Sequence, residues 1–148
     1  MNDKTICAVK GVIVRNGKIL VMKQEFDWGT FYDLPGGRVE RGRPPEEHLK
    51  TELKEELGLQ VDVGKVLGVS WYLRHTDGDH IVCILYECKP KRYDIDLTKN
   101  PCETENITKV MWVTPEEFMK LDPKSLFLRT TGNALKDFFA TLKPGAKR

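Results

Sequence analysis

The sequence lacks most features that mark secreted, membrane-bound or nucleic-acid-binding proteins. Its four cysteines, Cys7, Cys83, Cys88 and Cys102, have no CxxC spacing, which argues against a zinc site or a disulfide framework. A formal net charge of only +2 leaves no footprint for non-specific nucleic-acid binding. No apolar run is long enough to span a bilayer, and the first residues lack the pattern of a signal peptide. We therefore expect a cytoplasmic protein whose partners are neither membranes nor nucleic-acid polymers.

The chain also lacks internal repeats and low-complexity linkers. Its 148 residues, of which 40% are hydrophobic and 31% charged, suit one globular domain with a sizeable core. We expect this single domain to span residues 1–142 and a disordered C-terminal tail to occupy residues 143–148. No apolar stripe stands out beyond what a core requires, so the oligomeric state is left open, a dimer included.

Local patterns in the first half of the chain predict strands and one helix. Strands are expected over residues 5–15 and 18–24, because Asn16-Gly17 between them is a strong hairpin signal. Residues 26–36 contain aromatic residues and glycine, and we expect them to form a loop before a short strand near 37–40. Cys7 and Cys83 lie in apolar strand-like runs, so both are expected to be buried.

The second half predicts a further hairpin and two short helices. Residues 60–75 and 79–90 are expected to pair as strands, with a polar loop over 91–104 and a strand over 106–113. Thr114 and Glu117 form a capping-box pattern that begins a helix over 115–121, and apolar spacing predicts a last helix over 132–142. Together the elements predict an α/β fold in which a mixed sheet carries helices on both faces.

The most informative segment runs from Gly37 to Leu59. Pro44 and Pro45 suit a first helical turn, and Gly58 is a natural stop. Three glutamates, Glu52, Glu55 and Glu56, fall on one side of the predicted helix, while Leu49, Leu53 and Leu57 form an apolar stripe. Such a cluster is either a solvated acidic face or a site for hard divalent cations, which take oxygen ligands.

This segment resembles the signature of the Nudix hydrolase superfamily. The matching residues are Gly37, Glu52, Leu53, Glu55, Glu56, Gly58 and Leu59, and Tyr32-Asp-Leu-Pro-Gly-Gly37 resembles the family's usual entry into it. The resemblance implies a Nudix-type α/β/α sandwich with a mixed β-sheet. It also implies a Mg²⁺ or Mn²⁺ site made by the carbonyl of Gly37 and the carboxylates of Glu52, Glu55 and Glu56.

The resemblance further implies catalytic carboxylates. Glu52 stands at the position that acts as general base, or as a metal ligand, in different members. An acidic residue from a loop ahead of the strand that ends in Trp-Val often joins it. Glu105 is the better candidate for that role, and Glu103 is the alternative. Either residue could instead be a solvated loop carboxylate with no catalytic role.

The sequence departs from the signature at two positions. Arg43 stands where the family has glutamate, and Thr51 stands where it has the arginine that orients the catalytic glutamate. Threonine cannot donate the charged, bidentate hydrogen bonds of a guanidinium. One hypothesis is that Arg43 turns toward Glu52 and partly replaces the missing arginine. The alternative is that the two replacements reflect a weaker requirement for catalysis, which would leave a binding domain or a slow enzyme.

Substrate contacts are predicted at four residues, Lys23, Arg38, Tyr32 and Trp71. Lys23 resembles a basic position that contacts substrate phosphate in several members, and Arg38 offers a second cation. Tyr32 and Trp71, like Trp28, Phe31 and Tyr72, could stack on a base, although packing is the competing role for each. His48 is interpreted as a surface histidine.

These residues predict a divalent-metal-dependent hydrolase of a nucleoside diphosphate linked to another moiety. A nucleoside triphosphate is ranked first as the substrate, and ADP-ribose and dinucleoside polyphosphates follow. The alternative is a non-catalytic Nudix domain that senses nucleotides or binds a protein. Isomerase chemistry on an isoprenoid diphosphate is disfavoured because no cysteine has a convincing catalytic setting.

Overall fold

The computed structural model describes residues 4–97 and 106–143. Within them, the strands of the first half are β1 (Thr5–Val12), β2 (Val14–Arg15), β3 (Lys18–Phe26), β4 (Gly29–Asp33) and β5 (Gly36–Arg38). Helix α1 (Pro45–Leu57) precedes the strands β6 (Val61–Leu73), β7 (His80–Pro90) and β8 (Ile107–Val113). Three short helices follow, namely α2 (Pro115–Lys120), α3 (Leu126–Ala134) and α4 (Lys136–Ala140).

The strands form two four-stranded sheets. The first has the order β5-β1-β7-β6, in which β1 and β7 run parallel and the other pairs antiparallel. In the second, β3 pairs with β2, β4 and β8, always antiparallel. The predicted mixed sheet is thus confirmed, and the hairpin at Asn16-Gly17 forms as expected, with positive φ at both residues.

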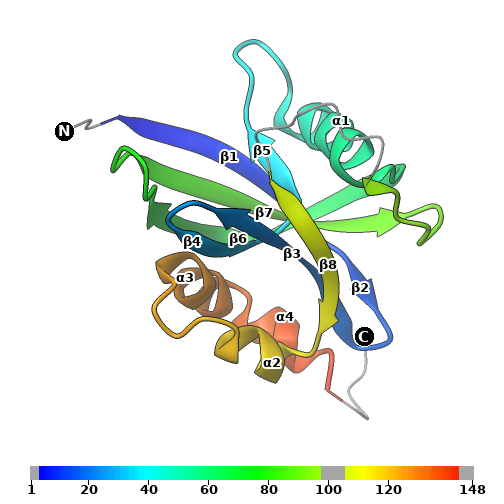
Figure 1. Ribbon diagram of the computed structural model, residues 1–148. Helices are drawn as coiled ribbons and strands as arrows, with labels where there is room; N and C mark the ends of the chain where they lie inside the picture. The colour runs from blue at the N-terminus through cyan, green and yellow to red at the C-terminus, as the bar shows by residue number, and fades with distance from the viewer. Residues whose placement is uncertain (1–3, 98–105, 144–148) are drawn as a thin grey trace.

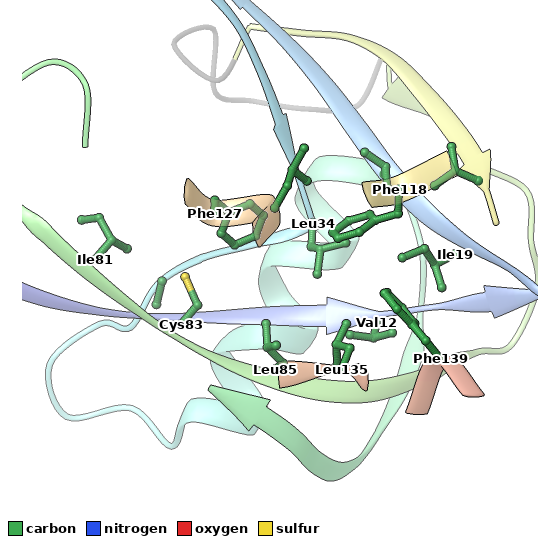
Figure 2. Packing of buried hydrophobic residues seen from close by; sticks show 14 of the residues in the cluster. Val12, Ile19, Leu34, Ile81, Cys83, Leu85, Phe118, Phe127, Leu135 and Phe139 are labelled. Atoms are coloured by element: carbon green, nitrogen blue, oxygen red, sulfur yellow. The ribbon is translucent and has the colours of Figure 1, made fainter. Parts of the chain in front are cut away.

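Helices cover the sheets from opposite sides, α1 on one and α2, α3 and α4 on the other (Figure 1). Side chains along β1 point alternately to the two faces of the sheet and so contribute to two separate hydrophobic cores. Ile6, Ala8 and Val12 pack with the cluster that contains Phe118 and Phe127, whereas Val9 packs with the leucines of α1. Figure 2 shows the first of these clusters, with Phe118, Phe127 and Phe139 around Val12 and Ile19. The predicted α/β/α layering is therefore confirmed.

Helix α1 begins and ends where local chemistry predicts. Pro45 occupies the first helical turn, and Gly58 closes the helix in the left-handed conformation, with φ of 68°, which glycine adopts without strain. Leu49, Leu53 and Leu57 are fully buried, so the apolar stripe is the packing face. No helix in the described part of the chain is long and apolar enough to cross a membrane.

The prediction of a loop over residues 26–36 is wrong in its middle. Residues Gly29–Asp33 form β4, which pairs with β3 through a tight turn at Asp27 and Trp28. The aromatic residues that suggested a loop lie on the strand itself, where Phe31 and Tyr32 pack against the larger core. Aromatic side chains suit a pleated, half-buried surface, which explains why this short segment pairs.

The prediction of one last helix over 132–142 is also wrong. The structure has two helices instead, because Leu135, with φ of −95° and ψ of 9°, interrupts the helical path between α3 and α4. Helix α3 begins earlier than predicted, at a cap where Ser125 Oγ accepts the Leu128 N–H at 3.1 Å. By contrast, the capping box of Thr114 and Glu117 forms as predicted. The domain boundary at residue 142 stays a prediction, and residues 144–148 lie outside the described residues.

The cysteines divide into one exposed and two buried thiols within the described residues. Cys83 and Cys88 are buried, but Cys7 is exposed, contrary to prediction. Cys7 alternates with Ile6 and Ala8 on β1, so it points to the α1 side of the sheet, beyond the part that α1 covers. Burial raises the pKa of the Cys83 thiol from 9.0 to about 11 and that of Cys88 from 9.0 to about 12.

We therefore expect native alkylation to discriminate between these thiols. Cys7 is exposed to the reagent, whereas Cys83 and Cys88 are buried and stay protonated at pH 9 because their thiolates form only at higher pH. Iodoacetamide at pH 9, followed by peptide-resolved mass spectrometry, should label Cys7 and spare Cys83 and Cys88. Labelling in denaturant provides the control. Equal labelling of Cys7 and Cys83 in the folded chain would contradict the burial described above.

Candidate active site

Two carboxylates of α1 lie directly against the glycines of β5. Glu56 is 3% exposed, and its Oε1 accepts the Gly36 N–H at 2.8 Å. Glu52 lies beside the next residue, since a Cβ added to Gly37 would be 2.9 Å from Glu52 Oε2. Because Gly36 and Gly37 have no side chains, the carboxylates of Glu52 and Glu56 fit against the strand. The glycines and glutamates of the sequence motif are therefore in direct contact.

Glu55 does not contact β5, and its predicted role as a metal ligand stays a prediction. It is exposed on α1, and within residues 4–97 and 106–143 no group of three His, Cys, Asp or Glu side chains is arranged to hold a metal ion. Around the helix axis, Glu56 lies roughly 40° from Glu52 on one side, and Glu55 lies roughly 60° from Glu52 on the other side. Of these three glutamates, Glu52 and Glu56 are the two that lie against β5 in the described structure.

An open cavity of about 880 Å³ lies over this contact. Its walls include both carboxylates, Gly37 and Arg38. The donor set suits a hard divalent cation, because carboxylate and backbone oxygens are the ligands that Mg²⁺ and Mn²⁺ prefer. The missing Cβ of Gly37 keeps Glu52 close to the strand backbone. The predicted acidic residues Glu103 and Glu105 lie outside the described residues.

The two positions that depart from the signature contact each other. Arg43 Nη2 donates to Thr51 Oγ1 at 2.9 Å, and Arg43 Nη1 lies 3.2 Å from His48 Nδ1. On the other side of the imidazole, His48 Nε2 lies 3.2 Å from Glu52 Oε1. The hypothesis that Arg43 turns directly onto Glu52 is therefore modified, because His48 lies between them.

His48 is not the surface residue that the sequence suggested. It is 3% exposed, because the loop that carries Arg43 folds over this part of α1. The sequence did contain a signal, since His48 precedes Glu52 by one helical turn and adjoins the buried Leu49. Spacing alone does not reveal that a loop arginine covers the ring.

A second cavity, of about 700 Å³, adjoins the first. Both cavities are lined by Gln24 and Asp33. The second cavity is aromatic, and the rings on its wall are those of Phe26, Trp28, Phe31, Tyr72 and Phe127. Three of its aromatic side chains form a ladder, in which Trp28 stacks on Phe26 at 5.2 Å and on His75 at 4.2 Å between ring centroids.

Asp33, at the junction of the two cavities, is held by a buried ion pair. Lys10 Nζ lies 3.0 Å from Asp33 Oδ2, and both side chains are less than one-tenth exposed, at 5% and 9%. Asp33 Oδ1 also accepts the Leu34 N–H at 2.8 Å. Lys10 lies on the same face of β1 as Ile6 and Ala8, so its ammonium group reaches Asp33 from within the core.

The predicted substrate contacts have different locations. Arg38 lines the carboxylate cavity, whereas Lys23, Tyr32 and Trp71 line neither of these two cavities. Lys23 is 3.2 Å from Glu25 Oε1, and Tyr32 packs against the larger core. Trp71 lies on β6 with 40% of its surface exposed. Trp28, Phe31 and Tyr72, which the sequence also offered as stacking residues, do line the aromatic cavity. Gln24 and Asp33 at the junction were not among the predicted site residues.

Comparison with known proteins supports one family. A family model described as NUDIX domain matches residues 6–131. A MutT-like protein from Streptomyces ambofaciens is 36% identical over 111 residues, which cover 74% of this chain and 64% of that protein. The nucleoside triphosphatase NudI of Enterobacter sp. (strain 638) is 29% identical over 136 residues, which cover 82% of this chain and 89% of that relative.

A solved structure supports the same fold. The MutT protein from Methanosarcina mazei Go1 superposes with a TM-score of 0.72 at 19% identity, over 96% of this chain and 95% of that one. At this identity the superposition concerns the fold alone. The family match, however, covers the strand glycines, the carboxylate helix and all the residues that line the two cavities except Thr5. This chain therefore belongs to the NUDIX domain family.

Proposed function

We propose that the protein is a Mg²⁺- or Mn²⁺-dependent hydrolase of a nucleoside diphosphate linked to another moiety, with a nucleoside triphosphate as the preferred substrate. The observation that carries the proposal is the junction of the two cavities at Gln24 and Asp33. A nucleotide joins a flat base to a chain of phosphates. One cavity offers aromatic faces for the base, and the other offers oxygen ligands and Arg38 beside the phosphates.

The residues divide the chemistry between them. The bound cation would supply charge neutralisation on the phosphates and lower the pKa of a coordinated water. Glu52, Glu55 and Glu56 would hold that cation, with the Gly37 carbonyl beside them, and Arg38 would pair with a phosphate oxygen. Glu52 would take the proton of the attacking water as the new P–O bond forms and the P–O bond to pyrophosphate breaks. A nucleoside triphosphate plus water would then give a nucleoside monophosphate and pyrophosphate.

The substrates are ranked by one relationship to a named protein and by one chemical likeness. NudI, whose name describes a nucleoside triphosphatase, aligns over most of its own length, which favours nucleoside triphosphates for this chain. ADP-ribose and dinucleoside polyphosphates follow, because both also present a diphosphate between a base and a second group.

The proposal is tested by a release assay over a nucleotide panel. Purified protein with Mg²⁺ or Mn²⁺ is incubated with nucleoside triphosphates, ADP-ribose and dinucleoside polyphosphates, and released pyrophosphate, phosphate and monophosphate are measured. A Glu55→Gln/Glu56→Gln variant runs alongside, and Glu55→Gln alone separates the two positions. Turnover that survives the double substitution would contradict the proposed site.

The replacement of the signature pair by Arg43 and Thr51 favours one alternative, a nucleotide-binding domain without turnover. That alternative predicts heat of binding in calorimetry for a panel member, and no product with either metal. Any metal-dependent product above the level of the double variant would exclude it.

The Gly37 position provides a separate test of the site. Gly37→Ala should lower kcat by at least about tenfold, because the new Cβ pushes on the Glu52 carboxylate, and misplacement near 1 Å costs up to about 100-fold. The fold should persist, since φ of Gly37 is not positive. Gly36→Ala is the matched contrast: its φ is 144°, and its Cβ would collide with the Val9 carbonyl, so this variant should lose stability. Equal thermal destabilisation of both variants would contradict this distinction.

A further inference from the structure

The contact between Arg43 and His48 determines which ring nitrogen carries the proton. A guanidinium has only donors and no acceptor. Because Arg43 Nη1 lies 3.2 Å from His48 Nδ1, Nδ1 must accept, and the neutral ring must carry its hydrogen on Nε2. That nitrogen lies 3.2 Å from Glu52 Oε1. The contact thus directs an N–H donor from the ring toward the carboxylate.

Burial makes the Nε2 donor depend on Glu52. His48 is 3% exposed, and Nε2 has no aligned hydrogen-bond partner in the part of the chain that the structure describes. The 3.2 Å approach to Glu52 Oε1 is within reach but poorly aligned, so a small rotation of either side chain completes the bond. Leaving such a buried donor unsatisfied costs about 1–3 kcal/mol, which favours a carboxylate that stays beside the ring.

Thr51 cannot perform this task itself. Its hydroxyl accepts from Arg43 at 2.9 Å and lies 3.3 Å from the Glu47 carbonyl, to which it donates. The hydroxyl is therefore used to hold the guanidinium against α1. Arg43 contacts Thr51 and His48 and also lies 3.7 Å from Glu40 Oε2, and it reaches Glu52 through the imidazole of His48.

We propose that Arg43 and His48 are positioning residues for Glu52. Arg43 fixes the Nε2–H tautomer, and the Nε2–H group restrains Glu52 Oε1, which leaves Oε2 on the Gly37 side of the cavity. The inference rests on the proposed function, because it assigns these residues through Glu52. It explains how the chain orients this carboxylate although threonine occupies position 51. Loss of such an outer hydrogen bond typically lowers activity or metal affinity about 10- to 100-fold.

Kinetics of substituted proteins test the proposal. Arg43→Ala and His48→Leu should each lower kcat by about 10- to 100-fold, with KM and thermal midpoint nearly unchanged. His48→Gln should retain more activity than His48→Leu, because a carboxamide accepts from Arg43 through oxygen and donates to Glu52 through nitrogen. Lys50→Ala, on the exposed face of α1, is the control. Unchanged kcat in Arg43→Ala would overturn the proposal.

A double substitution tests whether the family's usual residues at positions 43 and 51 can replace the pair found in this chain. Arg43→Glu/Thr51→Arg places a guanidinium next to Glu52 and should recover much of the kcat that Arg43→Glu alone loses. Recovery supports a positioning role for this pair. If the double variant is no better than Arg43→Glu although it folds, Arg43 does not act through the orientation of Glu52.

A spectroscopic measurement separates this inference from the proposed hydrolase activity. In ¹⁵N-labelled protein, the ring nitrogens of His48 should show an unprotonated Nδ1 and a protonated Nε2, and Arg43→Ala should weaken that preference. The Nε2–H signal should shift in Glu52→Ala. These readouts need no turnover, so an inactive wild-type protein with the expected tautomer refutes only the hydrolase. A proton on Nδ1 in the wild-type protein refutes the positioning, whatever the activity.

Discussion

Replacing Glu52 by glutamine is expected to lower kcat by about 100- to 10,000-fold, the usual contribution of a general base. Glutamine keeps the shape and the Oε1 acceptor that faces His48, but it removes the negative charge and the site for the water proton. The thermal midpoint should change little because the leucine stripe of α1 makes the packing contacts. Steady-state release assays, with kcat and KM measured separately, provide the result.

Glu47→Gln is the matched control for this experiment. Glu47 lies on the same helix, but its side chain is exposed and only 3.5 Å from Lys50 Nζ, and such surface pairs contribute about 0–1 kcal/mol. Removal of the Glu47 charge should leave kcat within about twofold of the wild-type value. If Glu52→Gln retains wild-type turnover, Glu52 is neither base nor essential ligand, and the site must be reassigned.

Replacing Lys10 by methionine is expected to lower the free energy of unfolding by about 3–5 kcal/mol, the typical cost of leaving one charge of a buried pair without its partner. Methionine retains the length and apolar stem of lysine, so the change isolates the charge. Asp33 would keep the Leu34 N–H but lose the ammonium at 3.0 Å. Urea unfolding at pH 7, with midpoint and slope compared, measures the loss.

The pH dependence and a double variant provide the controls. Burial already raises the pKa of Asp33 above 3.8, so at low pH the protonated, neutral carboxyl has little need of a partner. The difference between wild type and Lys10→Met should therefore be small near pH 4 and grow as pH rises and Asp33 ionises. Lys10→Met/Asp33→Leu should recover most of the stability. A loss that is equal at every pH would point to packing rather than charge.

The parts of the structure that local sequence specifies were predicted correctly. The proline start and glycine stop of α1, the turn at Asn16-Gly17 and the capping box at Thr114 each depend on residues within one or two turns. Where long-range contacts decide, prediction failed. Phe31 and Tyr32 form a strand because β3 offers a partner, and α3 ends at Leu135 because tertiary packing overrides the apolar periodicity.

The candidate site shows the same division. The carboxylate helix and its glycine strand are contiguous in the chain, and their resemblance to a family signature was visible. The grouping of aromatic residues into one cavity was not visible, because the cavity joins β3 and β4 to Tyr72 of the distant β6 and to Arg74 just after it. The role of His48 was also missed, since it depends on a loop arginine that contacts it from five residues away.

The parallel pairing of β1 and β7 has a consequence for how the chain reaches this structure. Thr5 pairs with His80 and Val12 with Glu87. The first strand therefore cannot form its parallel pairing until β7, much later in the sequence, has been synthesised. Contacts of such large sequence separation slow folding and prolong the exposure of apolar strands. During synthesis, β1 has only the short β5 beside it until β7 leaves the ribosome. Fragments that end before His80 should therefore aggregate, because β1 then has no β7 to pair with.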